Sequence, residues 1–359
     1  MSEEPPLLEL DSVTVAFENR PGLFEFGDES EQVRAVDDVS LTIETNDVVS
    51  LVGESGCGKT TLGKTAIGLQ RPTSGTVRYR GEDIWAIRDG SAETTQSWED
   101  VRSSLQIIHQ DPGSSLNPNR RLLSILSEPL RQVRPALGAS ERRERIYSLL
   151  ERVGMNPAPD FADRYPHQLS GGEQQRVALA RALLMNPDVI LADEAISALD
   201  VSLRVEMMDL MLELQAVFDT SFIFISHDLS NARYFTQHAS GKIAVMYLGR
   251  IAEISSAEQL IHNPQHPYTS VLRWATPDLG GDVSTPEEIP MRTIDVPDPV
   301  DPPSGCRFHT RCPEAREHCT AVEPDPLPAG GADVRCFRVR DGSPYWNSPR
   351  LEEEESSSS

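Results

Sequence analysis

Apolar and polar positions alternate along the chain in short and longer segments, which predicts strands interleaved with helices. Residues 7–17 and 36–43 show partial apolar–polar alternation and predict two strands, separated by a polar, glycine-containing loop at about 18–32. Further strands are predicted at 48–52, 75–80, 105–109, 188–192, 221–226 and 242–247. Two of them contain the continuous apolar runs VILA and FIFI, which are typical of strands buried on both faces of a parallel sheet. The pattern therefore indicates an α/β fold.

Helical segments fall between these strands. A helix is predicted at 59–69, and residues 121–153 contain two arginine- and leucine-rich helical segments with no strand signal, which we interpret as a helical subdomain inserted into the α/β core. After about residue 262 the composition shifts to proline, cysteine and polar residues, and the chain ends in LEEEESSSS. We expect that acidic end to be a disordered, solvated tail.

The chain is strongly acidic, and nearly all of its basic residues are arginine. The formal net charge is −23, and lysine occurs only at Lys59, Lys64 and Lys242, so 30 of the 33 basic residues are arginine. A carboxylate-rich surface with few lysines is typical of salt-loving cytoplasms and suggests a halophilic archaeon as the source. The alternative is an ordinary acidic protein with an acidic tail. In either case the charge argues against a broad nucleic-acid-binding surface.

Nothing in the sequence predicts membrane insertion or export. No run of about 18 apolar residues occurs, and the start of the chain, MSEEPPLLEL, lacks the basic and apolar regions of a signal peptide. We therefore expect a cytosolic chain in which disulfide bonds do not form.

A glycine-rich segment follows the predicted strand at 48–52. Its residues are Gly53, Glu54, Ser55, Gly56, Cys57, Gly58, Lys59, Thr60 and Thr61. They fit the pattern G-x-x-x-x-G-K-[ST], in which backbone N–H groups and a helix N-terminus point at one phosphate chain. In this pattern Lys59 reaches the β- and γ-phosphates and the Thr60 hydroxyl binds Mg²⁺. The alternative is a glycine-rich turn with a structural role only.

Two polar motifs flank the predicted helical insert. Gln110, in IIHQDP, ends a strand just before the insert and is placed to reach Mg²⁺ or an attacking water. In LSGGEQQR, Ser170 precedes Gly171, Gly172 and Glu173 at the start of a helix. With Ser170 as the N-cap, the N–H groups of the two glycines are free to bind an anion, which an ordinary capped helix start does not require.

Polar side chains also end two of the buried strands. VILADE places Asp193 and Glu194 there, where Asp193 is expected to bind Mg²⁺ and Glu194 to polarise a water for attack on a γ-phosphate. FIFISHD places His227 at the end of the other strand, where it would contact the γ-phosphate and position that water. Asp200, in SALD, leads into a helix and alone would be read as a helix cap.

Taken together, these motifs resemble the ATPase subunit of ABC transporters, in the family's order and over roughly residues 7–260. The resemblance implies an α/β fold with a P-loop NTPase core of the RecA-like type. It also implies an antiparallel β subdomain and an inserted helical subdomain at about 111–170.

The resemblance further implies that two cassettes face each other head to tail. The ATP and Mg²⁺ that Lys59 and Asp193 of one cassette bind are then enclosed by Ser170 and residues 171–173 of the other cassette. The catalytic residues implied by the family are Glu194, His227 and Gln110, with Gln110 also at the Mg²⁺ and Asp200 at the nucleotide.

Two positions of the resemblance are less regular. The aromatic residue that stacks on adenine would fall on Phe17, although Phe24 and Phe26 lie nearby. Ala195 and Ile196 stand where the family usually has proline and a small polar residue after the catalytic glutamate. We expect the turn to be retained there, and its effect on turnover stays open.

Several segments resemble the oligopeptide/dipeptide importer ATPases, above all NPQHPYTSVL at 263–272. This implies an ATPase domain at 1–262, a C-terminal extension of that type at 263–345 and the tail at 346–359. LGK after the phosphate loop resembles the second of two ATPase subunits, which favours a paralogous partner cassette over a homodimer. Two permease subunits, an extracytoplasmic peptide-binding protein and a peripheral location on the cytoplasmic side of the membrane are also implied. Nickel and sugars are alternative cargoes.

Four of the five cysteines lie close together in the extension. They are Cys306, Cys312, Cys319 and Cys336, with five, six and sixteen residues between them. In a cytosolic chain such a group of thiols suggests a metal site. The spacing lacks the paired C-x-x-C of common zinc ribbons, so a [4Fe–4S] cluster is favoured, with Zn²⁺ or no metal as the alternatives.

Two other functions fit parts of the pattern. Soluble ABC ATPases of translation or DNA repair usually carry tandem cassettes or a long coiled coil, whereas this chain has one motif set and an insert of ordinary size. A non-catalytic, nucleotide-binding regulator is disfavoured because Lys59, Asp193, Glu194 and His227 are all present. The sequence therefore favours an ATP-hydrolysing importer subunit that binds its permeases through the Gln110 loop and the helical insert.

Overall fold

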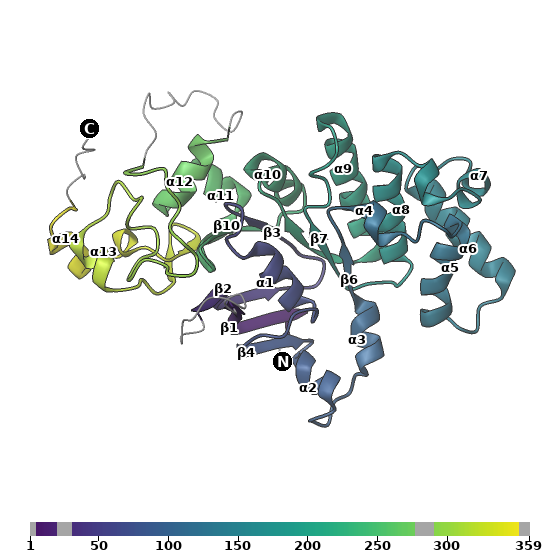
Figure 1. Ribbon diagram of the computed structural model, residues 1–359, viewed down its shortest axis with the longest axis horizontal. Coiled ribbons are helices and arrows are strands. Elements are labelled where there is room, and N and C mark those ends of the chain that lie inside the picture. Colours follow the sequence, from purple (N-terminus) through teal and green to yellow (C-terminus); the bar gives the residue numbers. More distant parts are fainter. Residues whose placement is uncertain (1–4, 20–30, 277–290, 352–359) are drawn as a thin grey trace, which may run out of the picture.

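The computed structural model describes residues 5–19, 31–276 and 291–351. Two β-sheets lie at the centre of the fold (Figure 1). The larger sheet has eight strands in the order β11-β12-β10-β9-β3-β8-β7-β6. Its parallel part consists of β9 (Lys242–Tyr247), β3 (Val48–Val52), β8 (Ser221–Ile225), β7 (Val189–Asp193) and β6 (Leu105–Ile108). Every residue of β3, β7 and β8 is buried, as their continuous apolar sequences predict.

A smaller antiparallel sheet packs against the first helix and β3. Its order is β2-β1-β4-β5, with β1 (Leu8–Asn19), β2 (Glu31–Ile43), β4 (Ser74–Tyr79) and β5 (Glu82–Asp83). The apolar side chains of β1, β2 and β4 share one hydrophobic cluster with α1 (Lys59–Ala66) and β3. Helix α1 ends at Ala66, so it is shorter than the helix predicted at 59–69. The chain turns at Gly68, where φ is +70°. Phe24, Phe26 and most of the predicted loop at 18–32 lie outside the described residues.

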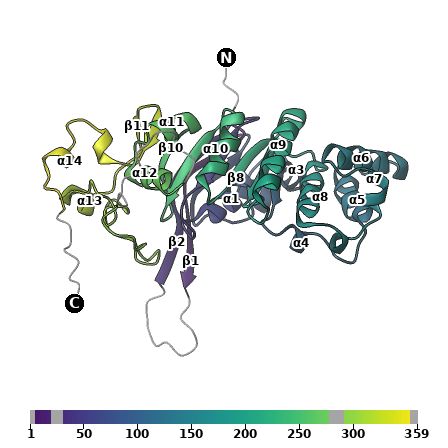
Figure 2. The same ribbon diagram turned by 90° about the horizontal axis from the view of Figure 1, so that it is seen from above.

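Helices surround the main sheet and form the insert. They are α2 (Ile84–Asp89), α3 (Trp98–Ser104), α4 (Pro112–Ser115), α5 (Leu122–Val133), α6 (Ala139–Arg152), α7 (Ala158–Ala162), α8 (Gly171–Leu183), α9 (Val201–Phe218), α10 (Leu229–His238), α11 (Ala257–His262), α12 (Pro267–Trp274), α13 (Glu317–Ala321) and α14 (Pro344–Asn347). Figures 1 and 2 both place α5–α7 at one end of the molecule and α13–α14 at the other. Among the residues described here, no helix combines the length and apolar character needed to cross a membrane.

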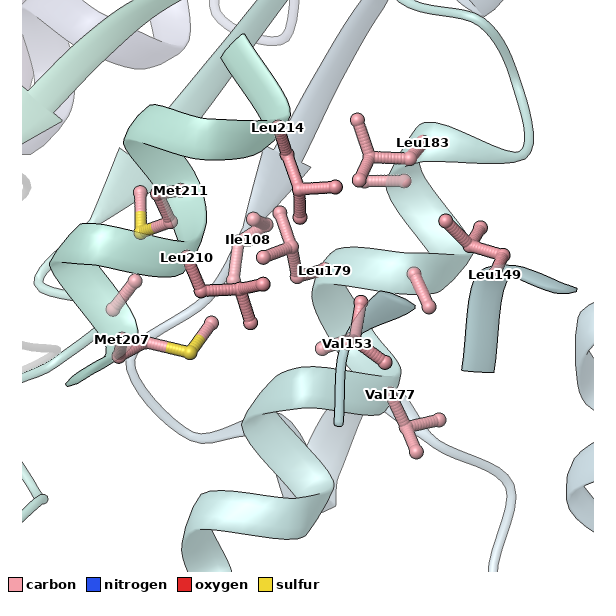
Figure 3. Close-up of a cluster of buried hydrophobic side chains, with 14 of the residues drawn as sticks. Ile108, Leu149, Val153, Val177, Leu179, Leu183, Met207, Leu210, Met211 and Leu214 are labelled. Atoms are coloured by element: carbon pink, nitrogen blue, oxygen red, sulfur yellow. The ribbon is translucent and has the colours of Figure 1, made fainter. Parts of the chain in front are cut away.

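One hydrophobic cluster joins the helical insert to the sheet. In Figure 3, side chains of α8 and α9 converge with Ile108 of β6 and Leu149 of α6. The labelled members are Ile108, Leu149, Val153, Val177, Leu179, Leu183, Met207, Leu210, Met211 and Leu214. The insert therefore packs on α8, the helix that begins directly after Ser170.

The C-terminal segment becomes part of the main sheet. Strand β12 (Ala332–Val334) pairs antiparallel with β10 (Arg250–Ser256), and β11 (Leu327–Ala329) pairs with β12. The structure differs from the sequence-based expectation at the chain end, because residues 346–351 are not a free tail. The Leu351 N–H donates to the Ala315 carbonyl oxygen at 3.0 Å. Only 352–359 of the predicted tail lies outside the described residues.

Phe235 holds α10 on the sheet. Its ring centroid lies 4.7 Å from that of Phe224 and 5.7 Å from that of Phe222, and all three residues are fully buried. Phe235→Ala is expected to lower the free energy of unfolding by about 3–5 kcal/mol, because it leaves a cavity between helix and sheet. Val217→Ala, at a half-exposed position on α9, should change it by less than about 0.5 kcal/mol. Denaturant melts of both variants measure the difference, and equal losses would contradict this packing.

Candidate active site

Three buried strands end side by side at one edge of the main sheet. In the order β3-β8-β7, Leu51 lies opposite Ile225, and Ile225 lies opposite Asp193. Because the strands are parallel, the segments that follow them emerge at the same edge. The glycine-rich loop, Glu194 and His227 are therefore brought together, as the sequence predicts.

The glycine-rich loop passes very close to other backbone. At Gly58, φ is +106° and an added Cβ would lie 2.0 Å from the Ala35 carbonyl oxygen. At Gly53, φ is +151° and an added Cβ would lie 2.1 Å from the Met246 carbonyl oxygen. No side chain fits at either position, so the curvature of the loop depends on glycine. The first N–H groups of α1 have no acceptor within the helix and are suited to bind an anion.

The Lys59 ammonium lies inside this loop. It donates to the carbonyl oxygens of Gly53 at 2.8 Å and Glu54 at 2.9 Å, and the residue is buried. A positive charge within a ring of backbone amides is suited to bind phosphate oxygens. Lys59 would exchange the two carbonyl oxygens for phosphate oxygens when a nucleotide binds.

Thr60 and Asp193 meet next to the loop. The Thr60 hydroxyl donates to Asp193 Oδ1 at 2.8 Å, and Asp193 is buried. A hydroxyl and one carboxylate match a Mg²⁺ site, since Mg²⁺ usually takes one or two protein oxygens together with substrate phosphates and waters. In the described part of the chain no group of three or more His, Cys, Asp or Glu side chains is arranged to hold a metal ion.

Glu194 and His227 face each other at the same edge. His227 Nδ1 lies 3.5 Å from Glu194 Oε2. The Glu194 backbone has a φ of +49°, which is an uncommon conformation for a residue with a side chain, and its N–H donates to the Ile225 carbonyl oxygen at 3.2 Å. This fixed backbone aims the carboxylate past the end of β7, where it can polarise a water beside the imidazole.

The turn after Glu194 is present despite the unusual residues in it. Ala195 and Ile196 are buried, and the Ser197 N–H donates to the Glu194 carbonyl oxygen at 3.0 Å. Apolar packing therefore occupies the positions where the resemblance expected proline and a small polar residue.

Three other predicted residues make no hydrogen bond or ion pair with Asp193 or Glu194. Gln110 is exposed just after β6, and Phe17 on β1 is 44% exposed and free to stack on a ligand. Asp200 caps α9, because its carboxylate accepts the Leu203 N–H at 3.0 Å. The helix-cap role considered for Asp200 is therefore real, whatever else the residue does.

Ser170–Glu173 form the start of α8 and do not join the glycine-rich loop. Ser170 Oγ accepts the Glu173 N–H at 3.3 Å, and the Glu173 carboxylate accepts the Ser170 N–H at 2.7 Å, which is a complete capping box. An added Cβ on Gly171 would meet nothing within 4 Å. Among the described residues no hydrogen bond links this segment to residues 53–61. The space next to the Gly171 backbone is therefore open.

The four cysteines of the extension surround one small cavity. Cys306, Cys312, Cys319 and Cys336 are all free thiols, and they line it together with His266. Burial raises the pKa of Cys312 to about 12 and that of Cys336 to about 11, and it lowers the pKa of His266 to about 3. At neutral pH these thiols and the imidazole are therefore uncharged, because the cavity disfavours charge.

Two residues near the site carry no sequence signal for the contacts that they make. Tyr268 and Arg311 belong to the C-terminal segment, yet both hydrogen-bond to Glu54 of the glycine-rich loop. Arg311 lies among 30 arginines in the chain, and only its place in the fold distinguishes it. The PYTS motif does mark the position of Tyr268, but its sequence does not reveal what the hydroxyl contacts.

Comparison with known sequences finds two family models and several relatives of nearly the same length. The ABC transporter model matches residues 36–197, and the model of the oligopeptide/dipeptide transporter C-terminal region matches 252–319. The dipeptide transport ATP-binding protein DppF of Haemophilus influenzae is 41% identical, over 94% of this chain and 98% of that protein. The oligopeptide transport ATP-binding proteins AppF of Bacillus subtilis and OppF of Escherichia coli are 41% and 38% identical, over 90% and 93% of this chain and 94% and 96% of theirs.

Comparison with solved structures finds the same architecture. The ATP-binding cassette MJ0796, in a dimeric structure of a post-hydrolysis state bound to ADP and Pi, has a TM-score of 0.57 and 27% identity over 70% of this chain and 98% of that one. CbiO1 of Clostridium perfringens, at 24% identity over 73% of this chain and 92% of that one, has a TM-score of 0.58 and the same fold. These likenesses confirm the predicted fold class.

Gly58→Ala tests the shape of the glycine-rich loop. The added methyl group would overlap the Ala35 carbonyl oxygen, so the loop must open, and we expect the dissociation constant of MgATP to rise at least about tenfold. Gly90→Ala is a matched control, because Gly90 also has a positive φ, of +62°, but an added Cβ there meets nothing within 4 Å. Equilibrium binding of a fluorescent ATP analogue measures both variants. Equal affinities of the two would contradict the close approach at Gly58.

Proposed function

We propose that this chain, which belongs to the ATP-binding subunits of the oligopeptide/dipeptide ABC transporters, couples ATP hydrolysis to the uptake of di- or oligopeptides across the cytoplasmic membrane. The observation that carries the proposal is the 41% identity to a dipeptide transport ATP-binding protein over almost its entire length, extension included. A different small solute, such as nickel or a sugar, is the alternative cargo.

Nucleotide binding follows from the glycine-rich loop. The N–H groups of the loop and of the start of α1 donate to the β- and γ-phosphates, and the Lys59 ammonium moves from the Gly53 and Glu54 carbonyl oxygens onto them. Thr60 and Asp193 are already 2.8 Å apart and would hold Mg²⁺ between them and the phosphates. Bound Mg²⁺ supplies positive charge that neutralises the phosphate oxygens during transfer. Phe17 would stack on the adenine.

Hydrolysis is assigned to Glu194, with His227 and Gln110 as supporting residues. The carboxylate of Glu194 accepts a hydrogen bond from the attacking water and orients its oxygen towards the γ-phosphate. His227, whose Nδ1 is 3.5 Å from that carboxylate, would donate to the γ-phosphate through its other nitrogen. Gln110 follows β6 directly and would reach the Mg²⁺ shell while its loop contacts a permease.

A second cassette is needed to complete the nucleotide site. The open N–H groups of Gly171 and Gly172 and the side chain of Ser170 lie away from the glycine-rich loop of their own chain. In a head-to-tail pair, these N–H groups and the Ser170 side chain would bind the γ-phosphate of the ATP held by the partner cassette. Their position apart from the loop of their own chain therefore supports a dimer. The solved relative MJ0796 is dimeric. A paralogous partner subunit, two permeases and an extracytoplasmic peptide-binding protein complete the proposed importer, on the cytoplasmic side of the membrane.

Glu194→Gln tests the hydrolytic assignment. Loss of the group that polarises the water should raise the barrier by about 3–5 kcal/mol, which lowers ATP turnover by roughly 10²- to 10⁴-fold. Binding of MgATP should persist, and ATP-bound dimers should accumulate in gel filtration. Glu213→Gln, at an exposed position on α9, is the matched control and should hydrolyse ATP at the wild-type rate. Unchanged hydrolysis by Glu194→Gln would reject the assignment.

We also propose that the four cysteines of the extension hold a [4Fe–4S] cluster with a structural role. The four thiols line one cavity, and their spacing lacks the paired C-x-x-C of common zinc ribbons, which supports a four-iron cluster over a single Zn²⁺. Burial raises the pKa of Cys336 and Cys319, and the positive charges of Arg338 and Arg316 oppose that shift in part.

Anaerobic purification tests the cluster. We expect brown protein that contains iron and acid-labile sulfide in equal amounts. Cys312→Ser should lose the colour, because it removes one of the four ligands. Cys57→Ser is the matched control, since Cys57 is the fifth cysteine and lies in the glycine-rich loop. Colourless wild-type protein, or protein that carries zinc without iron, would overturn the cluster.

A further inference from the structure

The C-terminal segment reaches into the active site through one side chain. Arg311 lies between Cys306 and Cys312, and its Nη1 and Nη2 donate to Glu54 Oε2 and Oε1 at 2.8 and 2.9 Å. Glu54 is the second residue of the glycine-rich loop. A guanidinium that binds both oxygens of a carboxylate fixes its direction as well as neutralising its charge.

The guanidinium of Arg311 is itself held in place. Arg311 is only 2% exposed, and its Nη1 also donates to the Tyr247 hydroxyl at 3.3 Å. Its guanidinium carbon lies 5.7 Å from the centroid of the Tyr247 ring and 5.8 Å from that of Phe308. One of these rings belongs to β9 of the core and the other to the extension, so the cation is positioned by both.

Tyr268 holds the same loop residue through its backbone. The Glu54 N–H donates to the Tyr268 hydroxyl at 3.0 Å. Tyr268 is fully buried, and its ring centroid lies 4.6 Å from that of Tyr247 and 5.3 Å from that of Phe308. Glu54 is therefore fixed at its amide and at its carboxylate by two residues that follow the core in the sequence.

The charge of Glu54 makes this contact relevant to the nucleotide. The Glu54 carbonyl oxygen accepts a hydrogen bond from Lys59, so the residue lines the loop that receives the phosphates. An uncompensated carboxylate on this loop would repel a polyphosphate and weaken its binding. The paired Arg311 cancels that charge at the point where the loop begins.

Attachment of the extension to the core does not depend on this pair. Arg335 contacts Asp38 at 3.2 Å, Arg250 contacts Glu323 at 2.7 Å, and Arg307 contacts Asp37. These contacts, with the pairing of β12 on β10, join the extension to the core through residues other than Glu54. The Arg311–Glu54 pair is thus additional to them and acts on the loop itself.

We propose that Arg311 is a positioning residue for ATP binding: it neutralises Glu54 and, together with Tyr268, fixes the start of the glycine-rich loop, so that the cysteine-bearing extension sets the nucleotide affinity of the site. The inference rests on the proposed ATPase function. It makes the extension a part of the nucleotide site rather than an appendage to it.

The two partners of the ion pair give opposite predictions. In the full-length chain, Arg311→Met leaves a lone carboxylate on the loop and should raise the dissociation constant of MgATP on the order of tenfold. Glu54→Gln removes the carboxylate and should bind MgATP at least as tightly as wild type. The double variant Glu54→Gln/Arg311→Met should return to within about twofold of wild type. A purely structural ion pair would instead weaken binding equally in both single variants.

Three further measurements sharpen this test. In the assembled transporter, Arg311→Met should raise KM for ATP and leave kcat within about twofold, because neither residue touches the γ-phosphate. Arg350→Met is the matched control, since it removes an exposed ion pair of the same extension, with Glu314, and should leave both constants unchanged. Arg311→Lys keeps the charge that neutralises Glu54 and gives up the two-point contact, so its dissociation constant for MgATP should lie between those of wild type and Arg311→Met; Glu54→Gln tests the inference even where Arg311→Met fails to fold.

Several results would overturn the inference. They are wild-type affinity in Arg311→Met, weakened affinity in Glu54→Gln, no recovery in the double variant, or no gain in affinity of Arg311→Lys over Arg311→Met. In each case wild-type protein that binds and hydrolyses ATP leaves the proposed function intact. Wild-type protein that does neither would reject the ATPase assignment and this inference together.

Discussion

The parallel adjacency of β3, β8 and β7 is the constraint on which the candidate active site depends. Lys59, Asp193 and His227 come from distant parts of the sequence, and only this strand order makes them neighbours. Two backbone hydrogen bonds continue the sheet just beyond the strand ends, from the Ser226 N–H to the Leu51 carbonyl oxygen and from the Glu194 N–H to the Ile225 carbonyl oxygen. The loops that carry the chemistry therefore start from fixed points on a fully buried support.

The parts of the site that could be predicted are those whose signal is local. The glycine-rich loop, Asp193 and His227 each follow a continuous apolar strand, and parallel strands bring such ends together. The contact of Arg311 with Glu54 could not be predicted, because 257 positions separate the two residues and only the folded extension unites them. The pairing of β12 with β10 was missed for a similar reason, since three-residue strands carry too little periodicity to be read.

Arginine supplies the cations at the junction between extension and core. The side chains of Arg250, Arg307, Arg311 and Arg335 contact carboxylates while only 3–15% exposed. A guanidinium is more weakly hydrated than an ammonium and can bind a carboxylate through two N–H groups, so it suits such buried pairs. Lysine is kept at Lys59, where the proposed function requires a compact charge that can bind phosphate oxygens. Part of the arginine bias therefore has a structural cause that is independent of the salt in which the protein works.

The short hairpin of β11 and β12 has a consequence for the behaviour of the protein at high concentration. Without it, the row of unpaired N–H and C=O groups along β10 would form the open border of the main sheet, which is a template for pairing with a second molecule. The hairpin covers part of that border, where β12 pairs with Glu253 and Ile254, and its outer strand is β11, which is three residues long and contains Pro328. Because proline has no N–H to donate and the strand is so short, the sheet ends in a border that other chains cannot readily extend, which protects the folded protein against aggregation.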